Sequence, residues 1–575
     1  RAVVWMAEGL ELEALEVGAL PIVRTLLDRL GWRPLLERAF DPPDRRLRLS
    51  HVDTALLLVC NFALSRHPLY GVSAWGARFG ARALGLAPGQ LELLNDDRLG
   101  RTLDRLFEID RRSLTTQLVL AMTRRYGVDL TRFHNDSTSI TFSGAYRYAE
   151  VGPRGRRLRI THGHNKDHRP DLKQLVWSLS ICGDGALPVH YNVFDGNQSD
   201  DRTHIPTWDA LRAIAGRSDF LYVADSKLCS RENMAYVVAH GGHFLTVMPA
   251  TRKEEAQFRS RLAHAPVLWN RLWERPSPRR KDDPPERFEA YEDAPTAEGY
   301  RLVWFRSSEK WKRDEQSRQH AIDQARFALQ QLRERVGHRQ LKTRAQVQAA
   351  VDRILEQYRA ADWVKVELVE KHRHRIKQIG PGRPGPFTTF GRETTTVFEP
   401  LDSVDDAAVQ AAAAADGIFP LVTDLPVEHW GALDMLQTYK YQAFIEKRHE
   451  QLKAAAEVVP VNFKNPERIE AFLFLYFLAI TLHGLIERQA RRAMKERKLP
   501  SLPLYPEDRQ CRAPTADKII SFFEPLRAYR LTRRNLAIQH FADPLSDLHR
   551  LILDLLEIPH NAYAASPSPL SSPSA

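Results

Sequence analysis

The chain of 575 residues carries 83 Lys and Arg against 72 Asp and Glu, a formal net charge of +11. This modest excess favours a polyanionic partner and argues against an acidic tail or a neutral ligand. The four cysteines form no Cys-x2-Cys pair, which argues against a zinc ribbon or a disulfide framework and indicates a reducing cytoplasm. The longest apolar run, 471–482, is shorter than the about 20 residues that cross a bilayer. We therefore expect a soluble intracellular protein with no membrane association, and three or four domains at roughly 150 residues each.

Residues 1–127 show helical spacing of apolar residues and no strand pattern, which predicts an all-α N-terminal domain. Helices are expected over 20–36, 52–64 and 113–126, with Asn95 as the N-cap of a further helix. Such a domain binds DNA through a helix-turn-helix or serves as a packing or dimerisation module. No basic recognition helix separates these two interpretations.

The pattern changes near residue 130, and residues 128–249 predict the first part of an α/β catalytic core. The expected strands are 131–142, 173–182, 187–194, 220–224 and 243–248. Helices are expected on either side of the fourth strand, and Ser230 is the N-cap of the second helix. This order predicts a mixed five-stranded sheet with flanking helices.

A long interruption follows, and residues 250–430 predict an insertion subdomain of mixed strands and helices. Its expected elements are a strand at 300–305, helices at 309–336 and 344–360, and a strand at 416–423. The Gly/Pro loop at 380–386 lacks the Gly-Lys-Ser/Thr ending of a P-loop. The remaining predicted parts are a second core segment at 431–460, a C-terminal helical region at 461–563 and a disordered tail at 564–575.

The stretch 436–453 contains no proline or glycine and is rich in good helix formers. A continuous helix here puts Tyr439, Glu446 and Lys453 seven residues apart, on roughly one face. Taken alone, this charged face is more typical of a solvated helix surface than of a functional site.

Two aspartates stand at strand positions that suit a site. Asp136 lies inside the first expected strand, and Asp225 directly follows the apolar strand 220–224. A carboxylate within a strand needs a compensating partner, and strand ends in open α/β sheets face the functional crevice. Each alone has an ordinary explanation, a turn contact for Asp136 or a loop cap for Asp225. On neighbouring strands they would converge and, with Glu446, form the carboxylate set of two-metal phosphodiester cleavage.

The order of these elements and several motifs resemble the DDE transposases of bacterial insertion sequences, whose core is ribonuclease H-like. The Tyr-x2-Arg-x3-Glu-x6-Lys motif of one subgroup corresponds here to Tyr439, Gln442, Glu446 and Lys453, with the spacing intact and Gln in place of Arg. The other matching stretches are FHNDSTSITFSGAY, GHNKDHRPDLKQL, FDGNQSDDRTH, VADSKLCS and NPERIEAFLFLYFLA. The resemblance runs from about Gly18 to the end of the C-terminal helices.

The resemblance implies a cut-and-paste transposase in which Asp136, Asp225 and Glu446 bind two Mg2+ ions, with Mn2+ as a possible substitute. Water would cut the transposon end, and the released 3′ hydroxyl would attack target DNA. It further implies a homodimer that holds terminal inverted repeats and target DNA, in a bacterial cytoplasm and nucleoid-associated when bound. Two other classes stay open: a ribonuclease H-like nuclease or resolvase, and a domesticated, non-catalytic DNA-binding protein.

DNA contacts are expected around this site. By resemblance, Tyr439, Gln442 and Lys453 contact phosphate near the cut. The basic stretch 151–173 adds the candidates Arg156, Arg157, Lys166 and Arg169. Basic stretches at 371–383 and 484–498 also fit DNA, although a single charge run is usually a solvated face.

Overall fold

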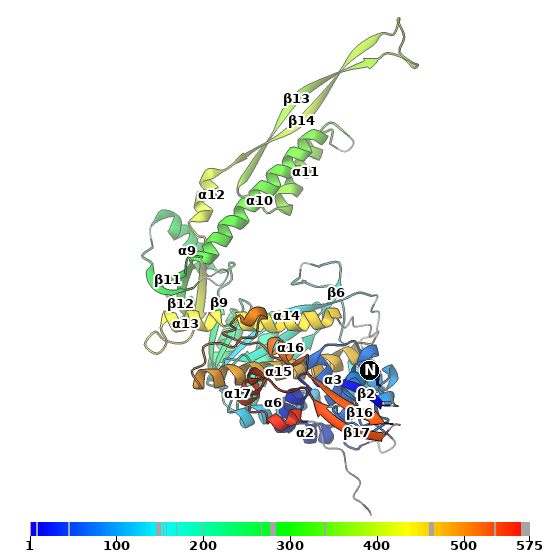
Figure 1. The fold of residues 1–575 in the computed structure, drawn as a ribbon. Coiled ribbons are helices and arrows are strands. Elements are labelled where there is room, and N and C mark those ends of the chain that lie inside the picture. Colours follow the sequence, from blue (N-terminus) through cyan, green and yellow to red (C-terminus); the bar gives the residue numbers. More distant parts are fainter. Residues whose placement is uncertain are drawn as a thin grey trace, which may run out of the picture. The chain divides into compact units, whose positions relative to one another are not determined.

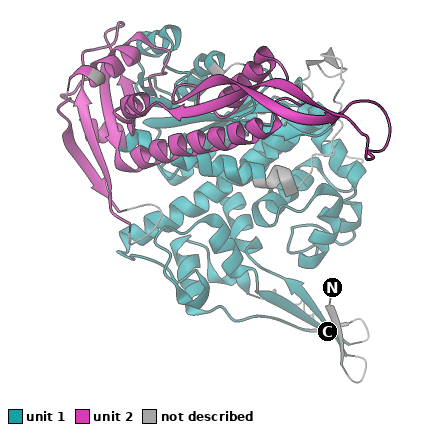
Figure 2. Ribbon diagram, turned by 90° about the horizontal axis from the view of Figure 1, so that it is seen from above, with its two compact units in different colours: residues 1–246, 437–575 teal, residues 247–436 magenta. Residues whose placement is uncertain are grey.

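The computed structural model describes all residues except 1, 7–9, 44–46, 145, 147–150, 153–154, 157, 168, 199, 266, 277–282, 339–340, 459–464, 534–535 and 565–575. Contacts divide the chain into two units (Figure 2). Unit 1 comprises Arg1–Thr246 and Gln437–Ala575, and unit 2 comprises Val247–Leu436. The predicted tail, 564–575, lies almost wholly outside the described residues.

Five neighbouring strands of a nine-stranded mixed sheet form the centre of unit 1. They are β3 (Arg132–Phe142), β6 (Lys173–Cys182), β7 (Pro188–Phe194), β8 (Leu221–Ala224) and β9 (His243–Val247). Their spatial order is β9-β8-β3-β6-β7. β3 runs antiparallel to β6 and parallel to β8, while β6–β7 is antiparallel and β8–β9 parallel. The five expected strands are therefore present in the expected chain order, but they belong to a sheet of nine strands, not five.

Helices cover this sheet. α14 (Ala443–Val458) packs on β3 and β6, while α7 (His204–Ala215) and α15 (Pro466–Glu496) contact β7. α8 (Arg231–Ala239) packs on α7. Most residues of β3 are buried, including neighbours whose side chains point to opposite faces of the sheet. Both faces of this strand are therefore covered. β3, the strand that carries Asp136, lies between β8 and β6.

α15 begins as the sequence predicts, because the Asn465 side chain accepts from the Glu467 N–H and Pro466 fills the first turn. Among the described residues it is the one helix long and apolar enough to cross a membrane by length and composition. In this structure 94% of its apolar window is buried inside the protein. Packing within the chain therefore accounts for its apolar sequence.

The N-terminal helices pack around α15 through α3 and α5. They are α1 (Leu20–Leu30), α2 (Trp32–Ala39), α3 (His51–Leu64), α4 (Val72–Phe79), α5 (Asp96–Glu108) and α6 (Arg111–Tyr126). The helix expected over 20–36 is two helices, because Gly31 adopts a left-handed conformation at φ 63°. Asn95 caps α5 as predicted.

The all-α prediction for residues 1–127 is wrong at the start of the chain. A four-stranded sheet in the order β1-β2-β16-β17 joins the two ends of the protein. Its strands are β1 (Ala2–Met6), β2 (Leu10–Glu16), β16 (Arg527–Arg533) and β17 (Leu536–Ala542). In β2, LELEALE, leucine and glutamate alternate only over residues 10–13, and the one buried side chain is that of Glu13. The region 461–563 is likewise not purely helical, since two strands accompany α15, α16 (Ala516–Phe523) and α17 (Asp547–Leu555).

Unit 2 combines four antiparallel strands with a helical pair and a long hairpin (Figure 1). Within the nine-stranded sheet, these four strands have the order β10-β11-β12-β15. The elements of unit 2 are α9 (Lys253–His264), β10 (Asn270–Arg275), β11 (Glu286–Glu292), β12 (Arg301–Ser307), α10 (Ser308–Arg335), α11 (Arg344–Gln357), β13 (Val364–Gln378), β14 (Phe390–Val404), α12 (Asp406–Ala413) and β15 (Ile418–Thr423). The helical pair and two of the strands match the prediction, whereas β10, β11, β13 and β14 were not expected. Two further short strands, β4 (Val151–Gly152) and β5 (Gly155–Arg156), lie in unit 1.

Candidate active site

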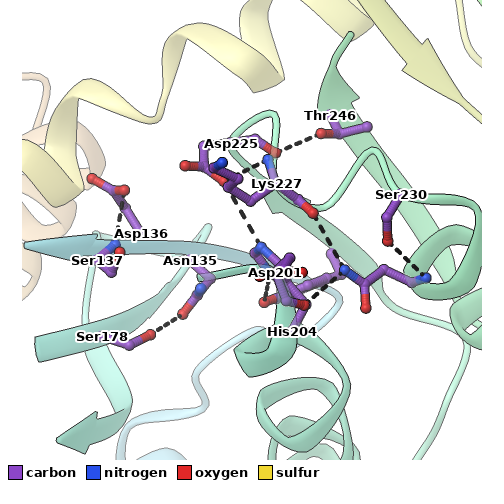
Figure 3. Close-up of polar contacts among 12 residues, drawn as sticks. Asn135, Asp136, Ser137, Ser178, Asp201, His204, Asp225, Lys227, Ser230 and Thr246 are labelled. Carbon is purple, nitrogen blue, oxygen red and sulfur yellow. Dashed lines mark hydrogen bonds and ion pairs between the residues drawn. The ribbon is translucent and has the colours of Figure 1, made fainter. Parts of the chain in front are cut away.

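Strand register brings Asp136 and Asp225 together. β3 and β8 run parallel, with His134 opposite Val223. Asp136 follows His134 by two residues on β3, and Asp225 follows Val223 by two residues, just past the end of β8. Side chains two apart share a face of a sheet, so the two carboxyl groups lie on the same side (Figure 3). The condition on which the two carboxylates were expected to converge, that their strands be neighbours, is therefore met.

Asp136 lies in a polar setting and is about one quarter exposed. The Ser137 N–H donates to Asp136 Oδ1 at 2.8 Å. Lys166 Nζ lies 3.8 Å from the same oxygen, and His449 Nε2 lies 3.6 Å from Oδ2. Lys166 Nζ also donates to the Ser137 carbonyl and hydroxyl oxygens, both at 2.7 Å. The Lys166 ammonium therefore offsets the cost of desolvating the Asp136 carboxylate inside the strand.

Asp225 is held by the turn that follows β8. The Lys227 N–H donates to its Oδ1 at 3.1 Å, and Thr246 Oγ1 donates to its backbone carbonyl at 2.6 Å (Figure 3). His204 Nε2 lies 3.8 Å from Oδ1. Burial raises the pKa of Asp225, and the negative charge of Asp136 raises it further, while His204 and Lys166 lower it. The two aspartates therefore repel each other in the metal-free protein.

Glu446 occupies the first turn of α14, the helix that packs on β3 and β6. Partial desolvation raises its pKa, followed by the charges of Asp136 and Glu450. Burial, followed by the negative charges of Glu446, Asp225 and Asp136, raises the pKa of Tyr439 to about 12. The three carboxylates therefore act together on the charge of this one phenol.

Hard carboxylate oxygens are the ligands that Mg2+ prefers, and a cation would relieve the repulsion between Asp136 and Asp225. The chemistry of the donor set therefore fits a divalent metal. In the part of the chain that the structure describes, however, no three Asp, Glu, His or Cys side chains are arranged to hold one ion. The carboxylates are thus assembled in one place but not closed into a single three-ligand cluster.

The helix expected over 436–453 is not continuous. α13 (Ala432–Lys440) ends before a two-residue turn, and α14 starts at Ala443. Tyr439 and Glu446 therefore lie on separate helices, and the predicted single face does not exist. They still meet at the site because the turn between them is fixed to β3.

Gln442 makes that attachment. Its Nε2 donates to the Asn135 carbonyl at 2.9 Å, and its Oε1 lies 2.9 Å from His134 Nδ1. Since a carbonyl only accepts, the amide nitrogen must face Asn135, so Oε1 accepts a proton from His134 Nδ1. Burial lowers the pKa of His134 to about 4, which leaves this imidazole neutral. Both ends of the Gln442 amide therefore bind the strand residues next to Asp136.

The other predicted DNA contacts already have partners in this structure. Lys453 pairs with Asp167, and Arg169 Nη2 pairs with Asp171 at 2.8 Å. Arg156 lies in β5, and Arg157 lies outside the described residues. Phosphate binding by these residues, and by Tyr439 and Gln442, stays a prediction.

His449 was not anticipated from the sequence. It lies three residues after Glu446 on α14, is buried, and is aligned with Asp136 at 3.6 Å. Burial, then Lys166 and Lys453, lower its pKa to about 3, so the ring is neutral. Within the described part of the chain, neither ring nitrogen makes a hydrogen bond of good geometry. The i, i+3 spacing from Glu446 is the signal that would have found it.

Comparisons with known proteins give limited matches. Residues 12–120 match a family model described as a domain of unknown function, DUF4277. No curated protein matches the sequence. Among solved structures, the chain is similar to one in a cryo-EM structure of the piggyBac transposase synaptic complex with hairpin DNA, with 10% identity and a TM-score of 0.24. The alignment covers 48% of this chain and 57% of that chain, which is less than two thirds of the transposase chain. At this TM-score the likeness does not establish a shared fold.

Proposed function

We propose that the protein is a DDE transposase of a bacterial insertion sequence, with a ribonuclease H-like core, that cuts and pastes DNA. The proposal rests on one observation: adjacent parallel strands carry Asp136 and Asp225 to the same level, beside the helix of Glu446. The neighbouring strands β9-β8-β3-β6-β7 support it, because the sequence motifs imply five mixed strands of this kind, which here are part of a nine-stranded sheet.

Asp136, Asp225 and Glu446 would hold two Mg2+ ions, for which Mn2+ is a plausible substitute. Such ions, when bound, activate water and offset charge on the leaving oxygen in phosphodiester cleavage. The chain's own groups then have distinct tasks. The Ser137 N–H orients Asp136, with Lys166 Nζ 3.8 Å from the same carboxylate oxygen, and the Lys227 N–H orients Asp225. Gln442 holds the start of the Glu446 helix against the Asp136 strand.

The proposal includes a homodimer that binds two terminal inverted repeats and target DNA in the bacterial cytoplasm. The net charge of +11 is consistent with such a partner. Release of a 3′ hydroxyl at the transposon end would supply the nucleophile for insertion, so the same site would serve both reactions.

The test uses a labelled duplex that carries the terminal inverted repeat, incubated with Mg2+. Wild type is compared with Asp225→Asn and with the control Asp219→Asn. Asp219 precedes the same strand but is well exposed and pairs with Arg217. We expect wild type and Asp219→Asn to cut alike and Asp225→Asn to lose at least about a hundredfold in rate, with DNA binding retained.

Equal cutting by wild type and Asp225→Asn would mean that the assigned carboxylates are wrong. Repeat-specific binding without cutting in Mg2+ or Mn2+ would identify a non-catalytic, domesticated protein. Such an outcome would agree with the finding that, among the described residues, no three metal-ligating side chains are arranged around one ion. Cutting that depends on Asp225 but not on the repeat sequence would identify a nuclease or resolvase.

A further inference from the structure

The hairpin β13–β14 is a two-stranded ribbon rooted in unit 2. Each strand has 15 residues, and among the described residues the pair forms a sheet of its own. The root is firm: Val364, Leu368 and Val397 share a hydrophobic core with α10 and α11. Arg373 donates to the Val336 carbonyl at 3.4 Å. Beyond this point the ribbon continues past the ends of both helices (Figure 1), and residues 371–397 are here called the arm.

Cations gather on one face of the arm. Because side chains alternate along a strand, Lys371, Arg373, Arg375 and Lys377 share one face. Their cross-strand neighbours on that face include a single acid, Glu393, opposite Arg375. At about 3.4 Å per residue the four cations recur about every 7 Å, which equals the axial rise of about two nucleotides of one DNA strand. Further cations, Arg383 and Arg392, lie toward the tip.

The existing acid partners hold these cations only weakly. Lys371 pairs with Glu399, and Lys377 Nζ lies 3.6 Å from Glu393. The Lys371 and Lys377 side chains are 50% and 68% exposed. Exposed pairs of this kind contribute about 0–1 kcal/mol, so exchange of a glutamate for a phosphate costs little.

Large apolar side chains stand exposed at the end of the arm. The exposed fractions are 76% for Ile376, 65% for Ile379, 97% for Phe387 and 54% for Phe390. A two-stranded ribbon has no core in which to bury them. Apolar side chains beside cations are the combination with which proteins stack on, or wedge between, bases.

We propose that the arm is a DNA-docking element that lays its cationic face along the backbone of a duplex, with the apolar tip against the bases. This proposal rests on the proposed DNA-processing function, and the arm would be the surface that binds the duplex outside the carboxylate site. A two-stranded ribbon fits the major groove, which is about 12 Å wide. A second copy of the chain is a poorer occupant, because two cationic arms repel each other.

The test measures binding of the full-length protein to a fluorescent duplex of about 30 base pairs between 50 and 200 mM KCl. The arm variant is Arg375→Gln with Lys377→Gln. The control is Lys342→Gln with Arg353→Gln, which removes the same charge from exposed positions around α11. We expect the arm variant to bind about tenfold more weakly at every sequence tested and to lower the slope of log K against log salt by about 2. The control should stay within twofold of wild type.

Wild-type affinity and salt slope in the arm variant, with an unchanged melting temperature, would overturn the proposal. So would a change of oligomeric state in the arm variant, seen by light scattering without DNA, if DNA affinity is unchanged. Failure of the proposed function is distinguishable: Asp225→Asn should bind DNA as wild type does. A protein that never cuts but loses affinity in the arm variant would retain the arm as its DNA-docking element.

Discussion

The carboxylate site of unit 1 and the arm of unit 2 are built in opposite ways. At the site, contacts such as Gln442 to Asn135 join residues 307 positions apart, and most of the contacting groups are shielded from water. In the arm, a single hairpin aligns neighbouring residues, and almost every side chain is exposed. Catalysis requires reacting groups in fixed relative positions, whereas electrostatic binding of a polyanion requires mainly several positive charges close together. Substitutions should therefore act through geometry at the site and through charge at the arm.

The largest expected effect is the loss of cleavage in Glu446→Gln. The amide keeps the size of the side chain but removes one of the charges that would bind metal, so cleavage should fall by at least about a hundredfold. The matched control is Glu450→Gln, one turn later on the same helix and also exposed, which should stay within about threefold. Cleavage assays at saturating DNA measure both. Similar losses in the two variants would indicate a general charge effect and not a metal ligand.

Gln442→Ala tests whether the site depends on its long-range attachment. The change leaves the Asn135 carbonyl and His134 Nδ1 without their partner, at a cost of about 1–3 kcal/mol for each group. We expect the free energy of unfolding, measured in urea, to fall by about 2–4 kcal/mol. Cleavage should fall as well, because the start of α14 loses its anchor. The control Gln437→Ala, an exposed neighbour on α13, should change the unfolding free energy by less than about 0.5 kcal/mol. Wild-type stability in Gln442→Ala would show that packing alone fixes the turn.

A pH titration tests the repulsion between the aspartates. The folded-state pKa of Asp225 is raised, so the folded protein holds this proton more tightly than the unfolded chain does. The carboxyl group therefore favours folding below its unfolded pKa of about 3.9, and this contribution is lost as the pH rises through the folded pKa. In EDTA at pH 7.5, Asp225→Asn should melt at or a few degrees above wild type, with the gap closing toward pH 4.

Mg2+ should reverse that order, because an ion bound to the folded state stabilises it by mass action. Wild type should gain a few degrees in melting temperature on addition of Mg2+, and Asp225→Asn should not. An equal gain in both proteins would place the bound ion elsewhere.

The smallest expected effect is on stability at the arm. Phe387 is 97% exposed, so Phe387→Ser should change the free energy of unfolding by less than about 0.5 kcal/mol. The buried Phe133 of β3 provides the contrast, since Phe133→Ala should cost about 3–5 kcal/mol. Destabilisation by Phe387→Ser would mean that the tip is covered within the folded protein. Together, the unfolding free energies of these two variants would separate the packed carboxylate site from the exposed arm.

Local sequence signals predicted much of unit 1. β6 has the predicted bounds, and Asn95 and Asn465 cap their helices as expected, because these features depend on neighbouring residues. The sequence placed Asp136 and Asp225 on strands but left open whether these strands are neighbours, which the pairing of β3 with β8 decides. The break before α14 was not predicted, because no proline or glycine marks it and the hydrogen bonds of Gln442 are tertiary. The buried position of His449 depends in the same way on the strand opposite.

Strands β13 and β2 were missed in the sequence for a different reason. β13 carries four Lys or Arg and two His within seven residues, KHRHRIK, so its composition suggests a solvated charge run. Strand formation there comes from pairing with β14 over the whole length, which composition does not reveal. β2 carried only a short signal, because leucine and glutamate alternate over residues 10–13 and the pattern breaks at Ala14.

The small sheet that joins β2 to β16 has a consequence for synthesis of the protein. Arg530 on β16 pairs with Glu13 on β2 at 2.5 Å, across 517 positions of the chain. At roughly 5–20 residues per second, β2 would leave the ribosome about 25 to 100 s before its partner. During that interval its edge is open to other strands. A chaperone that shields the nascent N-terminus, or a slow stage late in folding, is therefore expected for this protein, and chains that stop before β16 should aggregate instead of accumulating as active fragments.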